Sequence, residues 1–372
     1  MTVPKPPPPG TVAMSEVTSD ERQLAARNHG FLTEALRYPT TPIGMHYLLT
    51  HYDVPVVEPA TWSLEVGGLV EQPVSLTLEE IKSRPTVSRR VTFECAGNGR
   101  IALQPRALSQ PWGIEAVGTA EWTGTPLRLL LGEVGVSDAA VEVVFAGIDL
   151  GIENDIRQRY ERSLTLAEAL RGEVLLVYAI NGQDLPPQHG FPLRLIVPGW
   201  YGMTNVKWLS SITAVDQPFE GYQQGHAYRM RSVADERGTA LERIRPRALM
   251  APPGIPDYFT RYRSVAAGPV TLQGRAWSGF APIVSVEVTT DRGETWLEAT
   301  LEPQPDRYAW VGWMSQWEAE PGEHLLGCRA ADADGNRQPL EPEWNLGGYA
   351  CNAVHYLKIV VDPTSPIAVH RP

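Results

Sequence analysis

The chain contains few cysteines: only Cys95, Cys328 and Cys351 among its 372 residues. So small and odd a number cannot build a disulfide framework, which argues against a disulfide-stapled secreted fold. No apolar run reaches the roughly 20 residues that cross a bilayer, so no membrane-spanning helix is expected. Residues 1–23 show neither an apolar signal core nor a twin arginine. We therefore expect a cytoplasmic protein, or a periplasmic one if a leader peptide was removed.

Runs of basic residues are also absent, and the formal net charge is −11. Nucleic acid is therefore not an expected partner, and the acidic balance favours solubility. The sequence has no glycine fingerprint of a dinucleotide site and no C-x-x-C-H haem attachment motif. We expect no haem.

At roughly 100–200 residues per domain, the length of 372 residues indicates about two domains. Composition and pattern change at several points along the chain. They predict a Pro-rich leader and lead-in segment at 1–39, a mixed α+β domain at 40–240, a connector at 241–267, a β-sandwich at 268–362 and a tail at 363–372.

Short helices alternate with strand-like runs in the α+β domain. Thr77 with Glu80, and Thr165 with Glu168, have the spacing of two capping boxes. Pro126 is placed to occupy the first position of a third helix. Runs such as VEVVFAGID and EVLLVYAING are rich in β-branched residues and end in glycine, asparagine or proline, as strands do.

The pattern becomes purely strand-like after about residue 268. Val284, Val286 and Val288 alternate with other residues, so period two predicts that they share one face of a strand. Turn signals such as DRG recur about every ten residues, which is typical of an immunoglobulin-like β-sandwich. We interpret Cys328 and Cys351 as core residues of this sandwich.

The remaining cysteine, Cys95, lies in the stretch FECAGNGR at 93–100. It can be a buried core residue, or a nucleophile that takes its base from elsewhere in the chain. It can also be the single thiolate ligand of a soft metal that brings its other ligands, whereas zinc would need further nearby ligands. Gly97 and Gly99 leave room for a bulky group, and Arg100 is expected to lower the thiol pKa. These neighbours favour the metal interpretation.

ECAGNGR resembles the molybdenum-ligating cysteine motif of the sulfite oxidase family of molybdopterin enzymes. Three further parts of the chain resemble that family in the same order: EWTGTPLRLLL, the stretch NGQDLPPQHGFPLRLIVPGWYGMTNVKWL, and GRAWSGFAPIVSVEVTTDRGETW together with EPEWNLGGYACNAVHYLKI. The resemblance covers roughly residues 40–362. It implies a mixed molybdopterin-binding domain followed by an Ig-like dimerisation domain, and a homodimer.

The resemblance also implies a set of site residues. Cys95 would ligate the molybdenum of Mo-molybdopterin, the implied cofactor. The other cofactor contacts would be His51, Asp149, His189, Arg194, Asn205 and Lys207. Among these, His189, Arg194 and Lys207 would hold the pterin phosphate, and Asp149 would hold the amino groups of the pterin. The residues implied on the substrate side are Tyr228, Arg100 and Trp112.

Two departures from the family concern the substrate. Leu49 stands where sulfite oxidases carry a substrate-binding arginine. Trp313 aligns, ambiguously, with a second substrate-binding arginine of those enzymes. Arg100 and Arg229 would therefore supply the positive charge that holds the substrate anion. The leading hypothesis is oxygen-atom transfer to sulfite or a related sulfur oxyanion, with electrons passing to a separate acceptor. Two alternatives stay open: a sulfane-sulfur dehydrogenase with a carrier-bound substrate, and a non-catalytic Ig-like binding protein.

Overall fold

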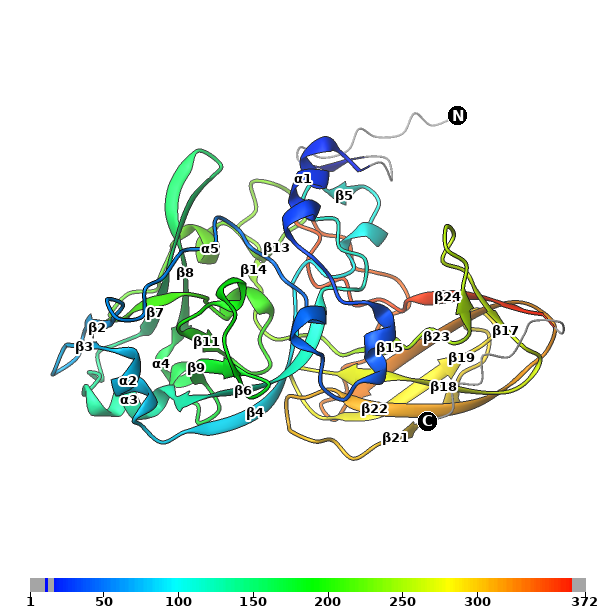
Figure 1. Cartoon of the computed structure of the whole chain (residues 1–372). Coiled ribbons are helices and arrows are strands. Elements are labelled where there is room, and N and C mark those ends of the chain that lie inside the picture. Colours follow the sequence, from blue (N-terminus) through cyan, green and yellow to red (C-terminus); the bar gives the residue numbers. More distant parts are fainter. Residues whose placement is uncertain (1–10, 13–16, 363–372) are drawn as a thin grey trace.

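The computed structural model describes residues 11–12 and 17–362, which form two lobes side by side (Figure 1). The first lobe mixes strands with short helices, and the second is a β-sandwich. The predicted order of a mixed domain followed by a sandwich is therefore confirmed, although strands outweigh helices throughout. The predictions for the Pro-rich leader and for the tail at 363–372 fall outside the described residues.

Two five-stranded sheets frame the first lobe. One has the order β10-β9-β6-β4 with β11 paired to β9, and the other has the order β3-β2-β12-β7-β8. Their apolar faces meet in a core that includes Leu64, Phe145 and Leu176. The strands are β2 (Leu64–Gly68), β3 (Val74–Leu76), β4 (Val87–Glu94), β6 (Val117–Pro126), β7 (Glu142–Glu153), β8 (Ile156–Thr165), β9 (Leu175–Ile180), β10 (Gln183–Asp184), β11 (Arg194–Ile196) and β12 (Leu209–Val215).

Two short strand pairs and several helical segments complete this lobe. β1 (Thr11–Val12) pairs with β5 (Arg106–Ala107), and β13 (Arg229–Met230) pairs with β14 (Thr239–Ala240). The helices are α1 (Ser19–Arg27), α2 (Leu78–Lys82), α3 (Leu127–Glu133), α4 (Leu166–Ala169) and α5 (Tyr222–Gly225), with 3-10 turns η1 (Thr33–Arg37), η2 (Ile43–Met45), η3 (Arg100–Ala102), η4 (Pro187–His189) and η5 (Gly202–Thr204). None of the helices in the described ranges has the length and hydrophobicity of a bilayer span.

The helix boundaries test the capping predictions. Thr77 and Glu80 form the complete capping box of α2, as predicted. Thr165 accepts the hydrogen bond from the Glu168 N–H, but the second box is incomplete because the Glu168 side chain accepts from neighbouring arginines and a tryptophan instead. Pro126 is the N-cap of α3 rather than its first helical residue.

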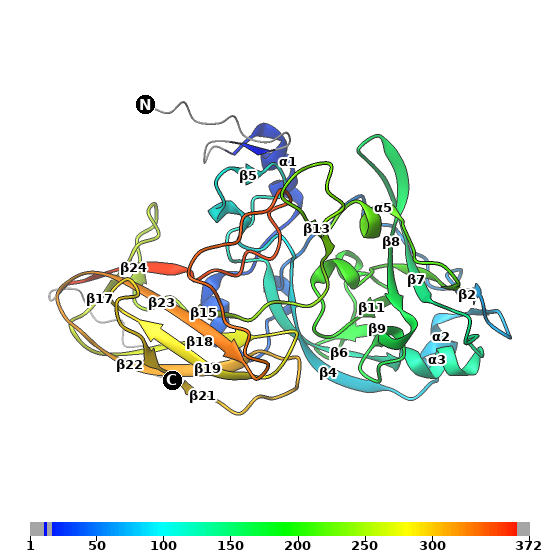
Figure 2. The same ribbon diagram turned by 180° about the vertical axis from the view of Figure 1, so that it is seen from behind.

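Two sheets stack in the second lobe, as Figure 2 shows from behind. Their orders are β15-β18-β22-β21 and β16-β17-β24-β23-β19-β20. The strands are β15 (Arg247–Met250), β16 (Ile255–Pro256), β17 (Arg263–Val265), β18 (Gly268–Trp277), β19 (Ile283–Thr289), β20 (Leu297–Glu298), β21 (Thr300–Leu301), β22 (Val311–Ala319), β23 (Gly322–Asp332) and β24 (Tyr356–Val361).

Several sandwich predictions need correction. The segment 241–267 was expected to be a connector, but it contains β15, β16 and β17, and the pairing of β15 with β18 and of β17 with β24 makes it part of the sandwich. Val286 and Val288 are buried as predicted. Val284 is 55% exposed, because a register shift between residues 283 and 285 turns it outward.

The two cysteines of the second lobe are buried, but only Cys328 has the predicted position in the sandwich core. Cys328 packs in the sandwich core. Cys351 lies on the segment between β23 and β24, where its carbonyl abuts Gly99 of the first lobe. This segment therefore brings the sandwich lobe against the loop that carries Cys95.

Candidate active site

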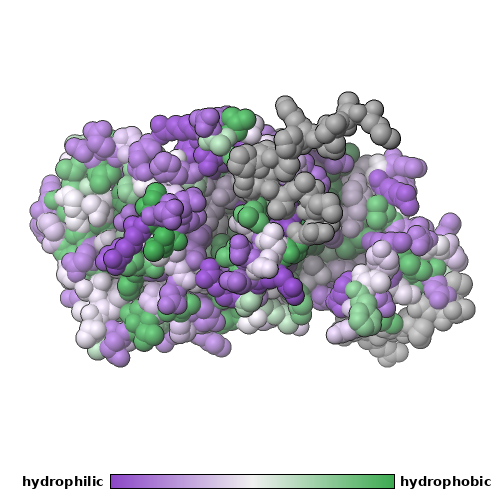
Figure 3. Space-filling view, turned by 90° about the horizontal axis from the view of Figure 1, so that it is seen from above, coloured by the Kyte–Doolittle hydropathy of each residue, from purple (hydrophilic) through white to green (hydrophobic). Residues whose placement is uncertain are grey.

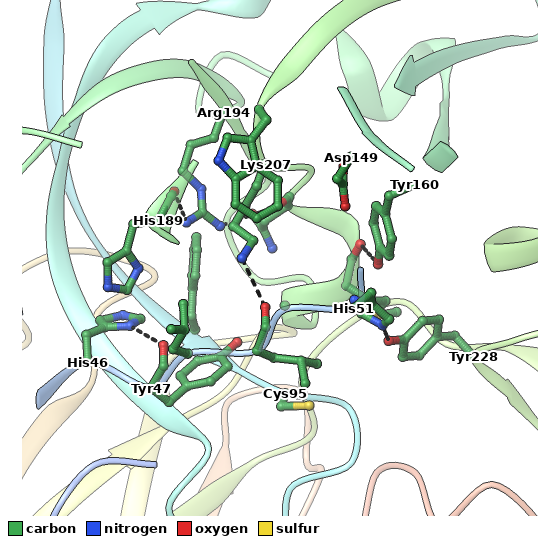
Figure 4. A pocket seen from close by; sticks show the side chains of 17 residues that line it. His46, Tyr47, His51, Cys95, Asp149, Tyr160, His189, Arg194, Lys207 and Tyr228 are labelled. Atoms are coloured by element: carbon green, nitrogen blue, oxygen red, sulfur yellow. Dashed lines mark hydrogen bonds between the residues drawn. The ribbon is translucent and has the colours of Figure 1, made fainter. Parts of the chain in front are cut away.

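A pocket opens in the first lobe and contains eight of the predicted site residues (Figure 4). Its walls come from segments far apart in the chain: residues 46–51, the end of β4, β7, β8 and the run from 189 to 208. The predicted residues in it are His51, Cys95, Asp149, His189, Arg194, Asn205, Lys207 and Tyr228.

One end of the pocket is cationic. Arg194 lies over the rings of Trp122 and Phe93, at 4.9 and 5.3 Å from their centroids. Its guanidinium donates to the carbonyls of His189 (2.9 Å) and Asn205 (3.3 Å). The Lys207 ammonium donates to the carbonyls of Leu49 and Gln188, both at 3.0 Å. Neither cation forms an ion pair with a carboxylate in the described part of the chain.

Burial without an ion-pair partner lowers the pKa of each basic group at this end of the pocket. Burial lowers the pKa of Lys207 to about 7, with a further reduction from the Arg194 charge. It lowers the pKa of Arg194 to about 10. The pKa of His189 falls to about 2, because of burial and then of His46, Arg194 and Lys207 nearby. An anion bound among these groups would reverse all three shifts, so this end of the pocket suits a phosphate.

Asp149 lines the same pocket and can hold hydrogen-bond donors. Its Oδ1 is buried and has no hydrogen-bond partner among the described residues. Burial raises its pKa to about 7, while the charge of Lys207 acts in the opposite direction. A buried acceptor without a partner costs free energy, which amino groups of a ligand would recover.

Cys95 lies on a tight loop that directly follows β4. Its N–H donates to the Ala116 carbonyl (2.9 Å), and Asn98 both donates to Glu94 (3.0 Å) and accepts from the Ala116 N–H (3.0 Å). Gly99 has φ +93°, and a Cβ there would collide with the Cys351 carbonyl. The glycine is therefore required by close backbone approach.

Two expectations for this loop are corrected. At Gly97 the space that a side chain would need is taken by the guanidinium of Arg100, so this glycine accommodates a neighbour within the loop. Arg100 does favour the Cys95 thiolate, but burial outweighs it and raises the pKa of the thiol overall. A metal bound to this sulfur would therefore have to displace its proton.

A second cavity adjoins the first and shares Leu49, His51, Cys95 and Tyr228 with it. The remaining predicted residues, Arg100 and Trp112, line this second cavity. All ten predicted site residues thus gather around Cys95. The indole N–H of the buried Trp112 has no well-formed hydrogen bond within the described residues. It lies close to the Cys95 thiol, where it acts to lower the pKa of that thiol.

Tyr228 stands between the two cavities. Its hydroxyl and His51 Nε2 share a hydrogen bond of 2.6 Å, and the guanidinium of Arg162 lies 5.9 Å from its ring centroid. Burial, followed by the charges of Lys207 and Arg27, lowers the pKa of His51 to about 3, so this histidine is neutral. Tyr228 adopts φ +49°, a conformation that is uncommon for a residue with a side chain.

The predicted substrate cations are less available than expected. Arg100 is buried and donates to the carbonyls of Gly348 and Gln110, both at 3.3 Å, with its guanidinium over the Tyr349 ring. Arg229 lines neither cavity, because it donates to carbonyls of 224, 237 and 238. Trp313 is packed in the sandwich core, so its alignment with a pocket arginine is wrong.

Sequence reasoning missed several residues that line the cavities. His46 lies edge-on to His189, with ring centroids 5.7 Å apart, and its buried Nε2 has no partner among the described residues. Tyr47 and Tyr160 line the first cavity, and Tyr349 lines the second. The two histidines of GMHYLLTH, His46 and His51, were a signal that could have indicated His46, but nothing in the sequence singled out the tyrosines.

The side chains present fit a molybdopterin. A cluster of buried cations without a counterion matches a phosphate, the unpartnered Asp149 oxygen matches amino groups, and a lone thiol matches a metal that arrives with other ligands. These three features line one pocket.

Comparison with known proteins agrees with this geometry. Residues 51–223 match the family described as the oxidoreductase molybdopterin binding domain, and residues 259–362 match the Mo-co oxidoreductase dimerisation domain. Mitochondrial sulfite oxidase of Drosophila melanogaster is 34% identical over 346 residues, covering 86% of this chain and 59% of that protein. Sulfite oxidase of Gallus gallus is 33% identical over 335 residues, covering 85% of this chain and 72% of the relative.

Two other similar proteins are named for reactions other than sulfite oxidation. A nitrate reductase of Hordeum vulgare is 32% identical over 365 residues, covering 90% of this chain but 40% of that protein. The solved sulfane dehydrogenase SoxCD from Paracoccus pantotrophus shares the fold, with a TM-score of 0.75, 24% identity, and coverage of 89% of this chain and 85% of that one. The chain spans about three fifths of the first mitochondrial relatives, 59% and 62% of their lengths. With its lone-thiol pocket and both matched domains, the chain belongs to the sulfite oxidase family of molybdopterin oxidoreductases.

Proposed function

We propose that this protein is a molybdopterin enzyme that oxidises sulfite or a related small sulfur oxyanion by oxygen-atom transfer. The observation that supports it most is the convergence on Cys95 of a cationic cofactor pocket and a second, adjoining cavity. The molybdenum cofactor would supply the oxygen atom and take up two electrons. Water would be the net source of that oxygen, two protons would be released, and a separate acceptor would take the electrons. A non-catalytic binding protein would not need this arrangement.

The protein's own residues would bind and orient the reactants. Arg194 and Lys207 would hold the phosphate of the cofactor, and His189 would become protonated beside it. Asp149 would accept hydrogen bonds from the pterin, and Cys95 would give its thiolate to the metal. Asn205, whose Oδ1 accepts from the Val197 N–H at 2.6 Å, would hold the pocket wall in place.

On the substrate side, Tyr228 and its partner His51 would fix the position of an oxygen of the substrate. Trp112, beside Cys95, has an indole N–H that could donate a hydrogen bond to the substrate. Arg100 would act mainly through its fixed charge, since two of its nitrogens already donate to carbonyls. Alignment of a small anion between these donors and the metal is the contribution expected of the protein.

A sulfane-sulfur dehydrogenase is the second candidate. Leu49 brings an apolar side chain to both cavities, and the buried Arg100 already donates from two of its nitrogens to carbonyls, so these two positions offer little free positive charge beside Cys95. Such a cavity suits a less charged, carrier-bound substrate better than it suits a small dianion.

Turnover with sulfite and an artificial electron acceptor tests the proposal. Sulfite-dependent reduction of the acceptor by molybdenum-loaded protein is expected, with a weak apparent affinity. Loaded protein that is inactive with sulfite but active with a sulfane on a carrier thiol would replace the first candidate by the second.

The matched dimerisation domain also supports a homodimer formed through the sandwich. Light scattering should give about twice the chain mass of 41.0 kDa at micromolar concentration. A mass of one chain would contradict this part of the proposal.

A further inference from the structure

The helix α1 precedes the matched molybdopterin-binding domain, which begins at residue 51, yet it walls the second cavity. Leu24, Arg27 and Asn28 line that cavity together with His51, Cys95 and Arg100. In Figure 1 this helix lies above the junction of the two lobes. Figure 3 looks onto the same side, where hydrophilic and apolar side chains are interspersed.

The helix is fixed firmly to the loop that follows Cys95. Glu21 and Arg106 form an ion pair whose side chains are essentially inaccessible to solvent. Burying two charges is costly unless they are paired with good geometry, and here two arginine nitrogens meet the two carboxylate oxygens. This pair attaches α1 to β5, so the helix is part of the cavity rather than an appended terminus.

Asn28 positions the end of the helix over the cavity. Its Oδ1 accepts from the Thr50 N–H (2.7 Å), and its Nδ2 donates to Leu24 O (2.9 Å) and Gln110 Oε1 (3.2 Å). The side chain is buried and joins the segment before His51 to the segment that also binds Arg100. Because Asn28 is fixed, the preceding residue, Arg27, is held where the second cavity opens to solvent.

Arg27 is the cation of this cavity that is open to solvent. Its guanidinium makes one long contact, 3.4 Å to the His51 carbonyl, and its charge contributes to the low pKa of His51. Arg100, the other arginine of the cavity, is buried and bound to two carbonyls and an aromatic ring. A substrate anion would therefore meet solvent-exposed hydrogen-bond donors at Arg27.

We infer that Arg27 is a specificity-determining residue that binds the anionic substrate at the mouth of the cavity, because Leu49, which also lines the cavity, carries no charge and the buried Arg100 already donates to two carbonyls. This inference rests on the proposed function. Because the side chain is solvent-exposed, its contribution lies between that of a surface ion pair and a charged hydrogen bond. We expect roughly a three- to tenfold effect on anion binding.

The experiment compares Arg27→Gln with Arg22→Gln in molybdenum-loaded protein. Both arginines are exposed on α1, but Arg22 does not line the cavity, so it controls for net charge. Arg27→Gln should raise KM for sulfite roughly three- to tenfold with little change in kcat, and Arg22→Gln should leave both unchanged. Leu49→Arg added to Arg27→Gln should lower KM again.

Binding of sulfate, measured by calorimetry on the same proteins, separates this inference from the proposed function. Weaker sulfate binding in Arg27→Gln alone supports the inference even if sulfite is not turned over. Equal effects of the two substitutions, or no effect of Arg27→Gln on sulfate binding or KM, would overturn it whatever the activity of the parent protein.

Discussion

Replacement of Glu94 by glutamine is expected to destabilise the protein strongly, because Glu94 joins the Cys95 loop to the sandwich lobe. Its carboxylate accepts from Arg247 (2.7 Å) in β15, Trp277 (2.8 Å) in β18 and Asn98 (3.0 Å) in the loop itself. The side chains of Glu94 and Arg247 are each only 2% exposed. Glutamine would leave the arginine charge buried without a counterion and would turn an amide N–H₂ towards one of the three donors.

The expected loss of stability follows from burial. Removing one partner of a buried ion pair typically costs about 3–5 kcal/mol. For a domain of 150–250 residues, each kcal/mol lowers Tm by about 2–4 °C, so a decrease of roughly 6–20 °C is expected. Glu133 offers a matched control, since it also pairs with an arginine at 2.7 Å, but its side chain is 53% exposed. Glu133→Gln should cost about 0–1 kcal/mol.

The assay is thermal unfolding of cofactor-free protein followed by tryptophan fluorescence, so that cofactor loss does not contribute. A double substitution, Glu94→Gln with Arg247→Met, should recover part of the loss, because it removes the unpaired charge. If Glu94→Gln lowered Tm no more than Glu133→Gln does, the reasoning about this buried pair would be refuted.

Four further outcomes are expected. Cys95→Ser should keep the fold and the pterin but lose the thiolate-to-metal absorption and turnover; an unchanged spectrum would exclude this cysteine as the ligand. Arg194→Ala should weaken cofactor retention roughly 10–150-fold, measured as pterin content after dialysis, and full occupancy would count against a phosphate role. Sulfate binding to cofactor-free protein should tighten as pH falls from about 9 to 7, because the pKa of Lys207 is about 7 without an anion and rises when one binds; calorimetry showing pH-independent affinity would contradict this. Tyr228→Phe should lower kcat about tenfold without changing molybdenum content, since it removes the hydrogen bond to His51, and an equal loss of metal would indicate a structural role instead.

The sequence predicted which residues line the cavities better than it predicted the contacts that those residues make. All ten predicted residues line the two cavities, because they lie in motifs whose type and order resemble one family. The hydrogen bond from Arg100 to the Gly348 carbonyl could not be predicted, since the two residues are 248 positions apart in the sequence. Trp313 was misplaced because an ambiguous alignment cannot distinguish a pocket residue from a neighbour that faces the sandwich core.

The fold shows the same division between local and long-range information. The capping box at Thr77 depends on residues three positions apart and was predicted. The exposure of Val284 was not predicted, because it depends on a register shift against another strand. The role of α1 was missed because the Glu21 to Arg106 pair that fixes it joins residues 85 positions apart.

The central claim is that the pocket around Cys95 holds a molybdopterin, and metal and pterin analysis of the purified protein tests it most directly. Molybdenum and pterin should be present in equimolar amounts with the chain, and both should fall together in Arg194→Ala. Addition of sulfite should then bleach the thiolate-to-metal absorption of the parent protein. Fully folded protein that contains neither molybdenum nor pterin after expression with the cofactor available would contradict the account.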